Sequence, residues 1–155
     1  MLGLAVLLVA LDQWLKQWAQ DVLMPQGSMA FIPGVLGFRY AENAGAAFGI
    51  MQGGRWFFIA LTAVVLVGIA LYEYKLPRTK KNLWVRVPLL LIVSGAAGNF
   101  IDRLLFGRVV DMLEFQFVRF PIFNLADVFL VVGTALYIFA VFFVLKKDTP
   151  SSKNA

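Results

Sequence analysis

Two carboxylates offer the strongest basis for chemistry in this 155-residue sequence. The chain has no histidine and no cysteine, so acid–base catalysis would depend on carboxylates, Lys, Tyr or water. Asp111 lies on the apolar face of a stretch that alternates like a strand, and Asp127 follows Leu125 at the start of an apolar segment. Two facing carboxylates share a proton, which provides a general base for water and a general acid for a carbonyl oxygen without a metal.

The surroundings of the two acids predict different protonation states. An apolar strand face favours neutral Asp111 and a helix start favours ionised Asp127, so we expect Asp127 to be the base. From the spacing alone, a purely structural role for the two acids is supported about as well as a catalytic role. Asn124 and Asp127 have the spacing of a helix cap whose fourth residue reaches back, and Asp111 could pair with an Arg.

Other polar residues lie within or at the ends of apolar segments. Asn99, Asp102 and Arg103 are spaced i, i+3 and i+4, so they share roughly one helix face. There the spacing favours an Arg103–Asp102 pair at the membrane interface over a functional site. Asp12 and Lys16 are spaced i and i+4, which predicts an internal salt bridge that stabilises the first helix in lipid.

The composition is that of a membrane protein, with 61% hydrophobic and 15% charged residues. Three stretches carry no charged side chain, namely 56–72, 87–101 and 128–145. The first eleven residues are also apolar but lack the basic start and cleavage site of a signal peptide, so we expect them to begin a further helix. The glycine-rich run at 94–98 indicates close helix packing. We therefore predict an all-α membrane protein of one domain, 1–155, with four transmembrane helices at about 2–22, 56–74, 84–102 and 126–146.

The basic residues predict the orientation. The net charge is +5, but Lys and Arg lie between the apolar stretches rather than along one surface, so we expect no nucleic-acid partner. Eight of them fall in the segment 73–86 and the C-terminal tail, and five fall in the segments 23–55 and 103–125. We therefore expect both termini to be cytoplasmic and the segments 23–55 and 103–125 to lie on the outer, periplasmic face.

The outer segments contain two predicted strands. Residues 27–54 hold seven of the thirteen glycines, which indicates several turns. Residues 38–43 and 108–117 alternate like strands, so they could pair in a small sheet on the outer side. Asn43 ends the first of these strands on the same side as the two acids.

Five short motifs, taken in order, resemble the lipoprotein signal peptidase family, also called signal peptidase II. They are DQWLK (12–16), NAGAAF (43–48), GNFIDR (98–103), VVD (109–111) and FNLAD (123–127). The resemblance implies an aspartic endopeptidase of the bacterial inner membrane that needs no cofactor and no metal. Such an enzyme removes the signal peptide from prolipoproteins at the bond before a Cys that carries diacylglyceryl. The implied partners are this lipid-modified substrate and membrane lipid.

The same resemblance implies roles for individual residues. It assigns the catalytic pair to Asp111 and Asp127, with the active site facing outward. Four positions match polar residues around the family's active site: Asn43, Asn99, Arg103 and Asn124. Three match positions that are structural: Asp12, Lys16 and Asp102. Family members have a longer, often basic stretch before the first motif, whereas eleven residues precede it here.

Two other classes of function remain as alternatives. A proton-coupled transporter would use acids inside the membrane to bind and release protons. A catalytically silent membrane scaffold would need no such groups. The three uncharged stretches contain no acid, and the acids of interest gather at one interface, which favours an enzyme over a transporter.

Overall fold

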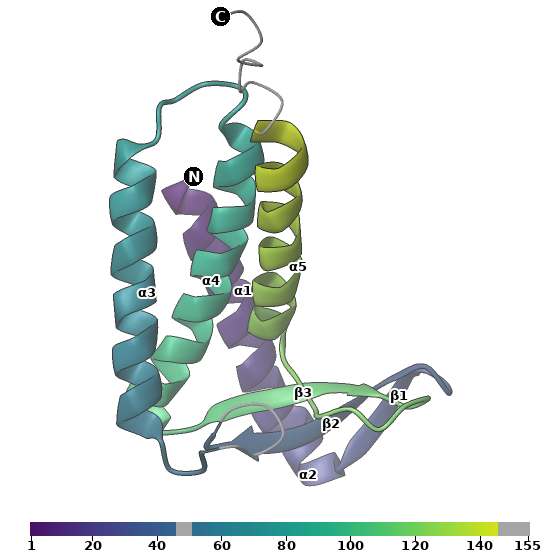
Figure 1. Ribbon diagram of the computed structural model, residues 1–155. Coiled ribbons are helices and arrows are strands. Elements are labelled where there is room, and N and C mark those ends of the chain that lie inside the picture. The colour runs from purple at the N-terminus through teal and green to yellow at the C-terminus, as the bar shows by residue number, and fades with distance from the viewer. Residues whose placement is uncertain (46–50, 146–155) are drawn as a thin grey trace, which may run out of the picture.

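The computed structural model describes residues 1–45 and 51–145 of the chain, and Figure 1 shows helices that run alongside one another with a small sheet across one end. The principal helices are α1 (Leu2–Trp18), α3 (Arg55–Lys75), α4 (Leu83–Phe106) and α5 (Leu125–Phe139). Helix α4 is central, because it contacts each of the other three. The connection between α3 and α4 lies at the end of the bundle opposite the sheet (Figure 1).

Two of the helices continue in a wider helical form. Helix α1 passes into a π-helical segment, η1 (Ala19–Leu23), and then a short helix, α2 (Met24–Gln26), so the helical run extends beyond the predicted end at 22. Helix α5 continues as the π-helical segment η3 (Ala140–Leu145). Its predicted end at 146 and the lysines of the tail lie outside the described residues.

Among residues 1–45 and 51–145, three helical segments are long and apolar enough to cross a membrane. They are Arg55–Lys75, Leu83–Phe106 and Leu125–Leu145, with mean hydropathies of 2.1, 1.6 and 2.7. At 1.5 Å per residue, about 20 residues span the hydrocarbon core of a bilayer. The chain is therefore a multi-pass membrane protein.

The sheet has three antiparallel strands in the order β1-β2-β3. They are β1 (Ser28–Ile32), β2 (Leu36–Asn43) and β3 (Val109–Phe115). The predicted pairing of the two alternating segments is confirmed, with Ala41 opposite Asp111. The prediction of turns alone before β2 was incomplete. Strand β1 is exposed along its whole length, so burial imposed no alternation on its sequence that could have revealed it.

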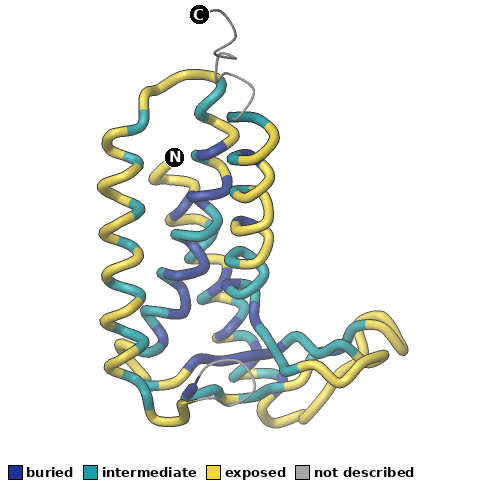
Figure 2. Tube along the Cα trace, viewed as in Figure 1, coloured by how far each residue is buried: buried dark blue, intermediate teal, exposed yellow. Residues whose placement is uncertain are grey.

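The buried residues gather along α4, where α1 and α5 meet it, and in the first part of β3 (Figure 2). The predicted close packing at the glycine run is confirmed. A Cβ atom at Gly95 would overlap the carbonyl oxygen of Ala126, and one at Gly98 would lie 2.5 Å from Asp12 Oδ2. These two glycines therefore let α5 and the Asp12 carboxylate approach α4 closely.

Candidate active site

Strand β3 positions Asp111 beside the helices. Its neighbours Val110 and Met112 are buried against Ala19 and Leu23 of η1, which anchors the strand to the end of the first helical run. Because successive side chains of a strand point to opposite faces, Asp111 is directed away from this cluster. It is 4% exposed and lines a cavity.

A helix cap holds Asp127 in the first turn of α5. Asn124 Oδ1 accepts a hydrogen bond from the Asp127 backbone N–H at 2.9 Å, and Asp127 Oδ2 accepts one from the Asn124 N–H at 3.1 Å. The predicted helix cap is thus confirmed as a capping box. The other carboxylate oxygen, Oδ1, accepts a hydrogen bond from Asn99 Nδ2 at 2.8 Å. The cap does not exclude a role in chemistry, since it fixes the direction of the carboxylate.

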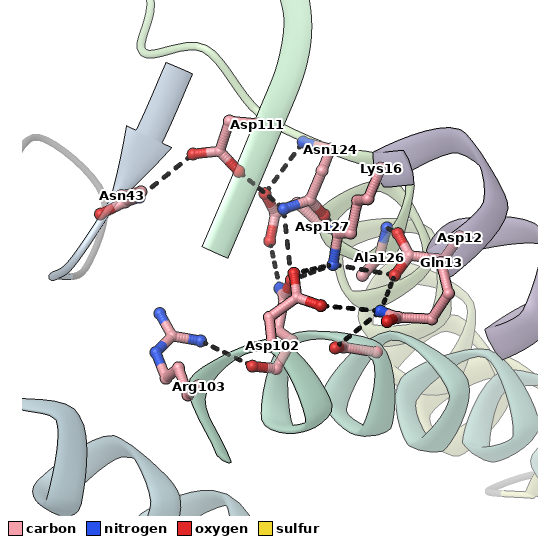
Figure 3. Close-up of polar contacts among 12 residues, drawn as sticks. Asp12, Gln13, Lys16, Asn43, Asp102, Arg103, Asp111, Asn124, Ala126 and Asp127 are labelled. Carbon is pink, nitrogen blue, oxygen red and sulfur yellow. Dashed lines mark hydrogen bonds and ion pairs between the residues drawn. The ribbon is translucent and has the colours of Figure 1, made fainter. Parts of the chain in front are cut away.

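Asparagine amides surround Asp111 (Figure 3). Asn124 Nδ2 donates to Asp111 Oδ1 at 2.7 Å, and Asn43 Nδ2 donates to Asp111 Oδ2 at 3.2 Å. Within the part of the chain that the structure describes, no Arg forms an ion pair with Asp111. The alternative that Asp111 pairs with an Arg was therefore wrong for these residues. The nearby Arg108 pairs instead with Glu42 at 3.0 Å.

Burial raises the pKa of Asp111 to about 7, and the neighbouring charge of Asp127 acts in the same direction. The hydrogen bonds from Asn124 and Asn43 oppose this effect, because they favour the ionised carboxylate. Desolvation outweighs them. The raised pKa of Asp111 agrees with the neutral form expected from the apolar strand face.

Asp111 and Asp127 line one cavity of about 480 Å³. Its polar lining consists of six residues: Asn43, Asn99, Arg103, Asp111, Asn124 and Asp127. Its apolar lining comes from β3, the β3–α5 connection and α5: Val109, Phe115, Phe120, Pro121, Ile122, Phe123, Val128, Leu130, Val131 and Val132. The cavity therefore combines an acid pair with a large surface suited to an apolar ligand.

Arg103 lies at the same cavity but does not pair with Asp102, so the predicted interfacial pair was wrong. Its guanidinium donates to the Gly45 carbonyl at 2.9 Å and lies 4.9 Å from the centre of the Phe58 ring. Adjacent residues on a helix point about 100° apart, so Arg103 and Asp102 contact different elements. The end of the NAGAAF motif, residues 46–48, lies outside the described residues.

Asp102 belongs instead to a buried charge cluster between α1 and α4. The predicted Asp12–Lys16 salt bridge is confirmed at 2.8 Å, and Lys16 Nζ also lies 2.9 Å from Asp102 Oδ2. Sequence reasoning gave no role to Gln13, whose amide donates to Asp102 Oδ1 at 2.8 Å. The signal available was a second polar residue beside Asp12 in an apolar helix.

No group of three His, Cys, Asp or Glu residues suited to a metal occurs among residues 1–45 and 51–145. Two carboxylates that line one cavity can hold a water molecule and exchange its proton. Together with the membrane-spanning helices, these features describe a membrane protein with two carboxylates at one cavity.

The comparisons with known proteins give the family. A model of the family described as signal peptidase (SPase) II matches residues 4–143. The chain is 45% identical over 131 residues to the lipoprotein signal peptidase of Streptococcus thermophilus (strain CNRZ 1066), and the aligned region covers 84% of each chain. It is 46% identical over 133 residues to that of Streptococcus pyogenes serotype M6, which covers 86% of each. The chain belongs to the signal peptidase II family.

Two solved structures of bacterial membrane enzymes are similar to the whole fold. One, determined by the in meso method at 2.3 Å resolution, has a TM-score of 0.85 and 34% sequence identity, and covers 99% of this chain and 92% of that one. The other, at 1.9 Å, has a TM-score of 0.82 and 35% identity, and covers 92% of both. The similarity extends over the sheet as well as the helices.

Proposed function

We propose that this chain is an aspartic endopeptidase that removes signal peptides from diacylglyceryl-modified prolipoproteins at the bond before the lipidated Cys. Membership of the signal peptidase II family supports a protease that acts on lipoprotein precursors. The observation that carries the aspartic mechanism is the pair of carboxylates, Asp111 and Asp127, in one cavity with an apolar lining.

Asp127 acts as the base and Asp111 as the acid in this mechanism. Asp127 takes a proton from a water molecule, whose oxygen attacks the carbonyl carbon of the scissile amide. Asp111 gives its proton to the carbonyl oxygen, and its pKa of about 7 supports this role. The C–N bond of the resulting diol then breaks. Asp127 returns a proton to the departing amine, and Asp111 recovers one from a diol hydroxyl.

The polar residues around the pair hold the reacting groups in place. Asn43, Asn99 and Asn124 orient the two carboxylates through their side-chain amides. Arg103 borders the cavity and binds the substrate backbone or polarises its carbonyl. The apolar lining receives the acyl chains, so the substrate can remain in the bilayer during cleavage.

The orientation in the membrane is part of the proposal. The helical run of α1, η1 and α2 forms a fourth span, supported by the burial of its polar residues: Asp12 is 0% and Lys16 2% exposed, so lipid does not meet these charges. The basic α3–α4 connection lies opposite the sheet (Figure 1), which supports cytoplasmic termini. The sheet and the acid pair then face outward from the bacterial cytoplasmic (inner) membrane, and residues 1–155 form one domain.

Asparagine substitutions of the two acids test the mechanism. In detergent, with a diacylglyceryl-modified precursor, Asp111→Asn and Asp127→Asn should each lower kcat by about 10²- to 10⁴-fold, because neither amide can exchange the proton. The double variant should lose little more, since the two acids act as a unit. Glu114→Gln is the matched control, because Glu114 lies on the same strand but pairs with Arg39. Chelators should leave cleavage unchanged. Near-normal cleavage by either single variant would refute the acid pair.

A further inference from the structure

The ammonium group of Lys16 contacts three oxygen atoms behind the acid pair (Figure 3). Nζ lies 2.8 Å from Asp12 Oδ2, 2.9 Å from Asp102 Oδ2 and 3.0 Å from Asn99 Oδ1. The first two contacts are ion pairs with carboxylates, and the third is a hydrogen bond to an amide. The third oxygen belongs to a neutral amide, although the two carboxylates of Asp12 and Asp102 already more than offset the single charge of Lys16.

This third contact fixes the orientation of the Asn99 amide. Asn99 Oδ1 accepts hydrogen bonds from Lys16 Nζ at 3.0 Å and from Asn124 Nδ2 at 3.2 Å. If the amide were reversed, its NH₂ group would face two donors and lose both bonds. Asn99 Nδ2 must therefore point to the other side, where it donates to Asp127 Oδ1 at 2.8 Å.

The side-chain amide of Asn124 is also fixed in orientation, and it contacts Asp111. Asn124 Nδ2 donates to Asn99 Oδ1 and, at 2.7 Å, to Asp111 Oδ1. Its own Oδ1 accepts from the Asp127 N–H, so this amide cannot reverse either. One buried cation is thus linked to both carboxylates through two amides, by side-chain contacts alone.

The charge cluster is also tied directly to the helix that carries Asp127. Asp12 Oδ1 accepts a hydrogen bond from the Ala126 backbone N–H at 2.9 Å, one residue before Asp127. Gly98 leaves the space that the Asp12 carboxylate occupies. The cluster therefore lies where α1, α4 and α5 meet, directly behind the acid pair.

We propose that Lys16 is a positioning residue of the active site, which holds the Asn99 amide in the one orientation that lets Asn99 and Asn124 donate to Asp127 and Asp111. This inference rests on the proposed function, because it assumes that these two acids perform the cleavage. It replaces the purely structural role that the resemblance implies for Lys16.

The double variant Lys16→Gln, Asp102→Asn tests the proposal, since it removes one charge of each sign and keeps polar side chains. We expect kcat to fall about tenfold to a hundredfold with KM little changed, because the acids lose their alignment while the cavity is kept. The matched control is Glu73→Gln, Arg86→Gln, which removes another ion pair of α4, 3.1 Å long, away from the cavity. This control should lower the thermal stability but leave kcat unchanged.

A second readout separates positioning from stability. The charged groups that act on Asp111 are Asp127 of α5, Lys16 of α1 and Arg103 of α4. The Lys16 charge lowers the pKa of Asp111. In the single variant Lys16→Gln, in which Asp102 keeps its charge, the basic limb of the kcat/KM profile should therefore move to higher pH, whereas the Glu73→Gln, Arg86→Gln control should leave the limb in place.

The Asn99→Ala variant tests the link that runs from Lys16 through Asn99 to the two acids. It keeps the ion pairs of Lys16 with Asp12 and Asp102 but removes the link to the acids, so it should reproduce the kcat loss. In this background the Lys16→Gln, Asp102→Asn changes should lower kcat no further. If the Lys16 variant does not fold, a retained kcat in Asn99→Ala still overturns the inference, because the link runs through Asn99.

Retained kcat in Asn99→Ala, or losses that multiply independently, would overturn the inference. Because Asp111→Asn is measured in the same assay, the two failures can be told apart. An inactive Asp111→Asn beside a fully active Lys16 variant rejects only the positioning role. An active Asp111→Asn rejects the proposed mechanism itself.

Discussion

Cleavage should decrease as the pH rises above neutrality, because Asp111 must carry a proton to act as the acid. Burial and the charge of Asp127 raise the pKa of Asp111 to about 7. For one ionising group with this pKa, the protonated fraction is about one half at pH 7, one tenth at pH 8 and one hundredth at pH 9. On its basic limb, kcat/KM should therefore fall about tenfold per pH unit.

A single amide tests whether this limb belongs to Asp111. Asn43 Nδ2 donates to Asp111 Oδ2 at 3.2 Å, which lowers the pKa of Asp111 by favouring its ionised form. A hydrogen bond worth about 1 kcal/mol corresponds to roughly 0.7 pKa unit. In Asn43→Ala, the basic limb should move upward by about half to one pH unit. Asn82→Ala is the control, because the Asn82 amide donates to the Pro77 carbonyl in the α3–α4 connection.

The assay is the initial rate of cleavage of a lipid-modified precursor, at substrate concentrations that give kcat/KM, between about pH 6 and pH 9. The raised pKa of Asp111 also affects folding. Because the folded-state pKa lies above the value in the unfolded chain, this group's contribution to stability is lost as the pH rises through about 7. Thermal melts at each pH therefore accompany the rates. A profile without a basic limb, or an Asn43→Ala limb at lower pH, would refute the assignment of Asp111 as the acid.

Two further predictions concern the membrane topology and the helix packing. In the cysteine-free chain, Lys80→Cys should react only with a thiol reagent on the cytoplasmic side and Gln52→Cys only with reagent added outside, and the reverse pattern would contradict the orientation. Gly98→Ala should destabilise the fold by about 1–3 kcal/mol, because the added methyl group would lie 2.5 Å from Asp12 Oδ2. Gly68→Ala in α3 meets no atom within 4 Å, so a similar loss in both thermal melts would contradict the packing argument.

Local patterns predicted the parts of the fold and the candidate site that depend on neighbours in the chain. The uncharged stretches predicted α3, α4 and α5, because lipid excludes charge. The alternation around Asp111 predicted strand β3 but not the burial of both its faces from Val109 to Met112, and the spacing of Asn124 and Asp127 predicted the helix cap. Each pattern reflects the periodicity or the capping chemistry of a single element.

The contacts between elements could not be predicted in this way. Asp102 was assigned to Arg103, but it pairs with Lys16 because of the rotation of α1 against α4, which no spacing within α4 reveals. The link from Lys16 through Asn99 was hidden for the same reason. Hydropathy gives no account of such contacts either, since polar residues of α1 contact Asp102, which lies more than 80 positions away in the chain.

Helix α3 has no buried residue, whereas α4 buries ten of its 24 residues against its neighbours. The choice of residues in the middle of α3 is thus constrained by the surrounding lipid rather than by a complementary protein surface. Over evolutionary time, Leu, Ile, Val and Phe can replace one another there if the apolar length is kept. Helix α4 must keep its small residues at fixed positions. Lineages of this enzyme should therefore diverge fastest in α3, which can adapt to the thickness of the host's membrane without disturbing the acid pair.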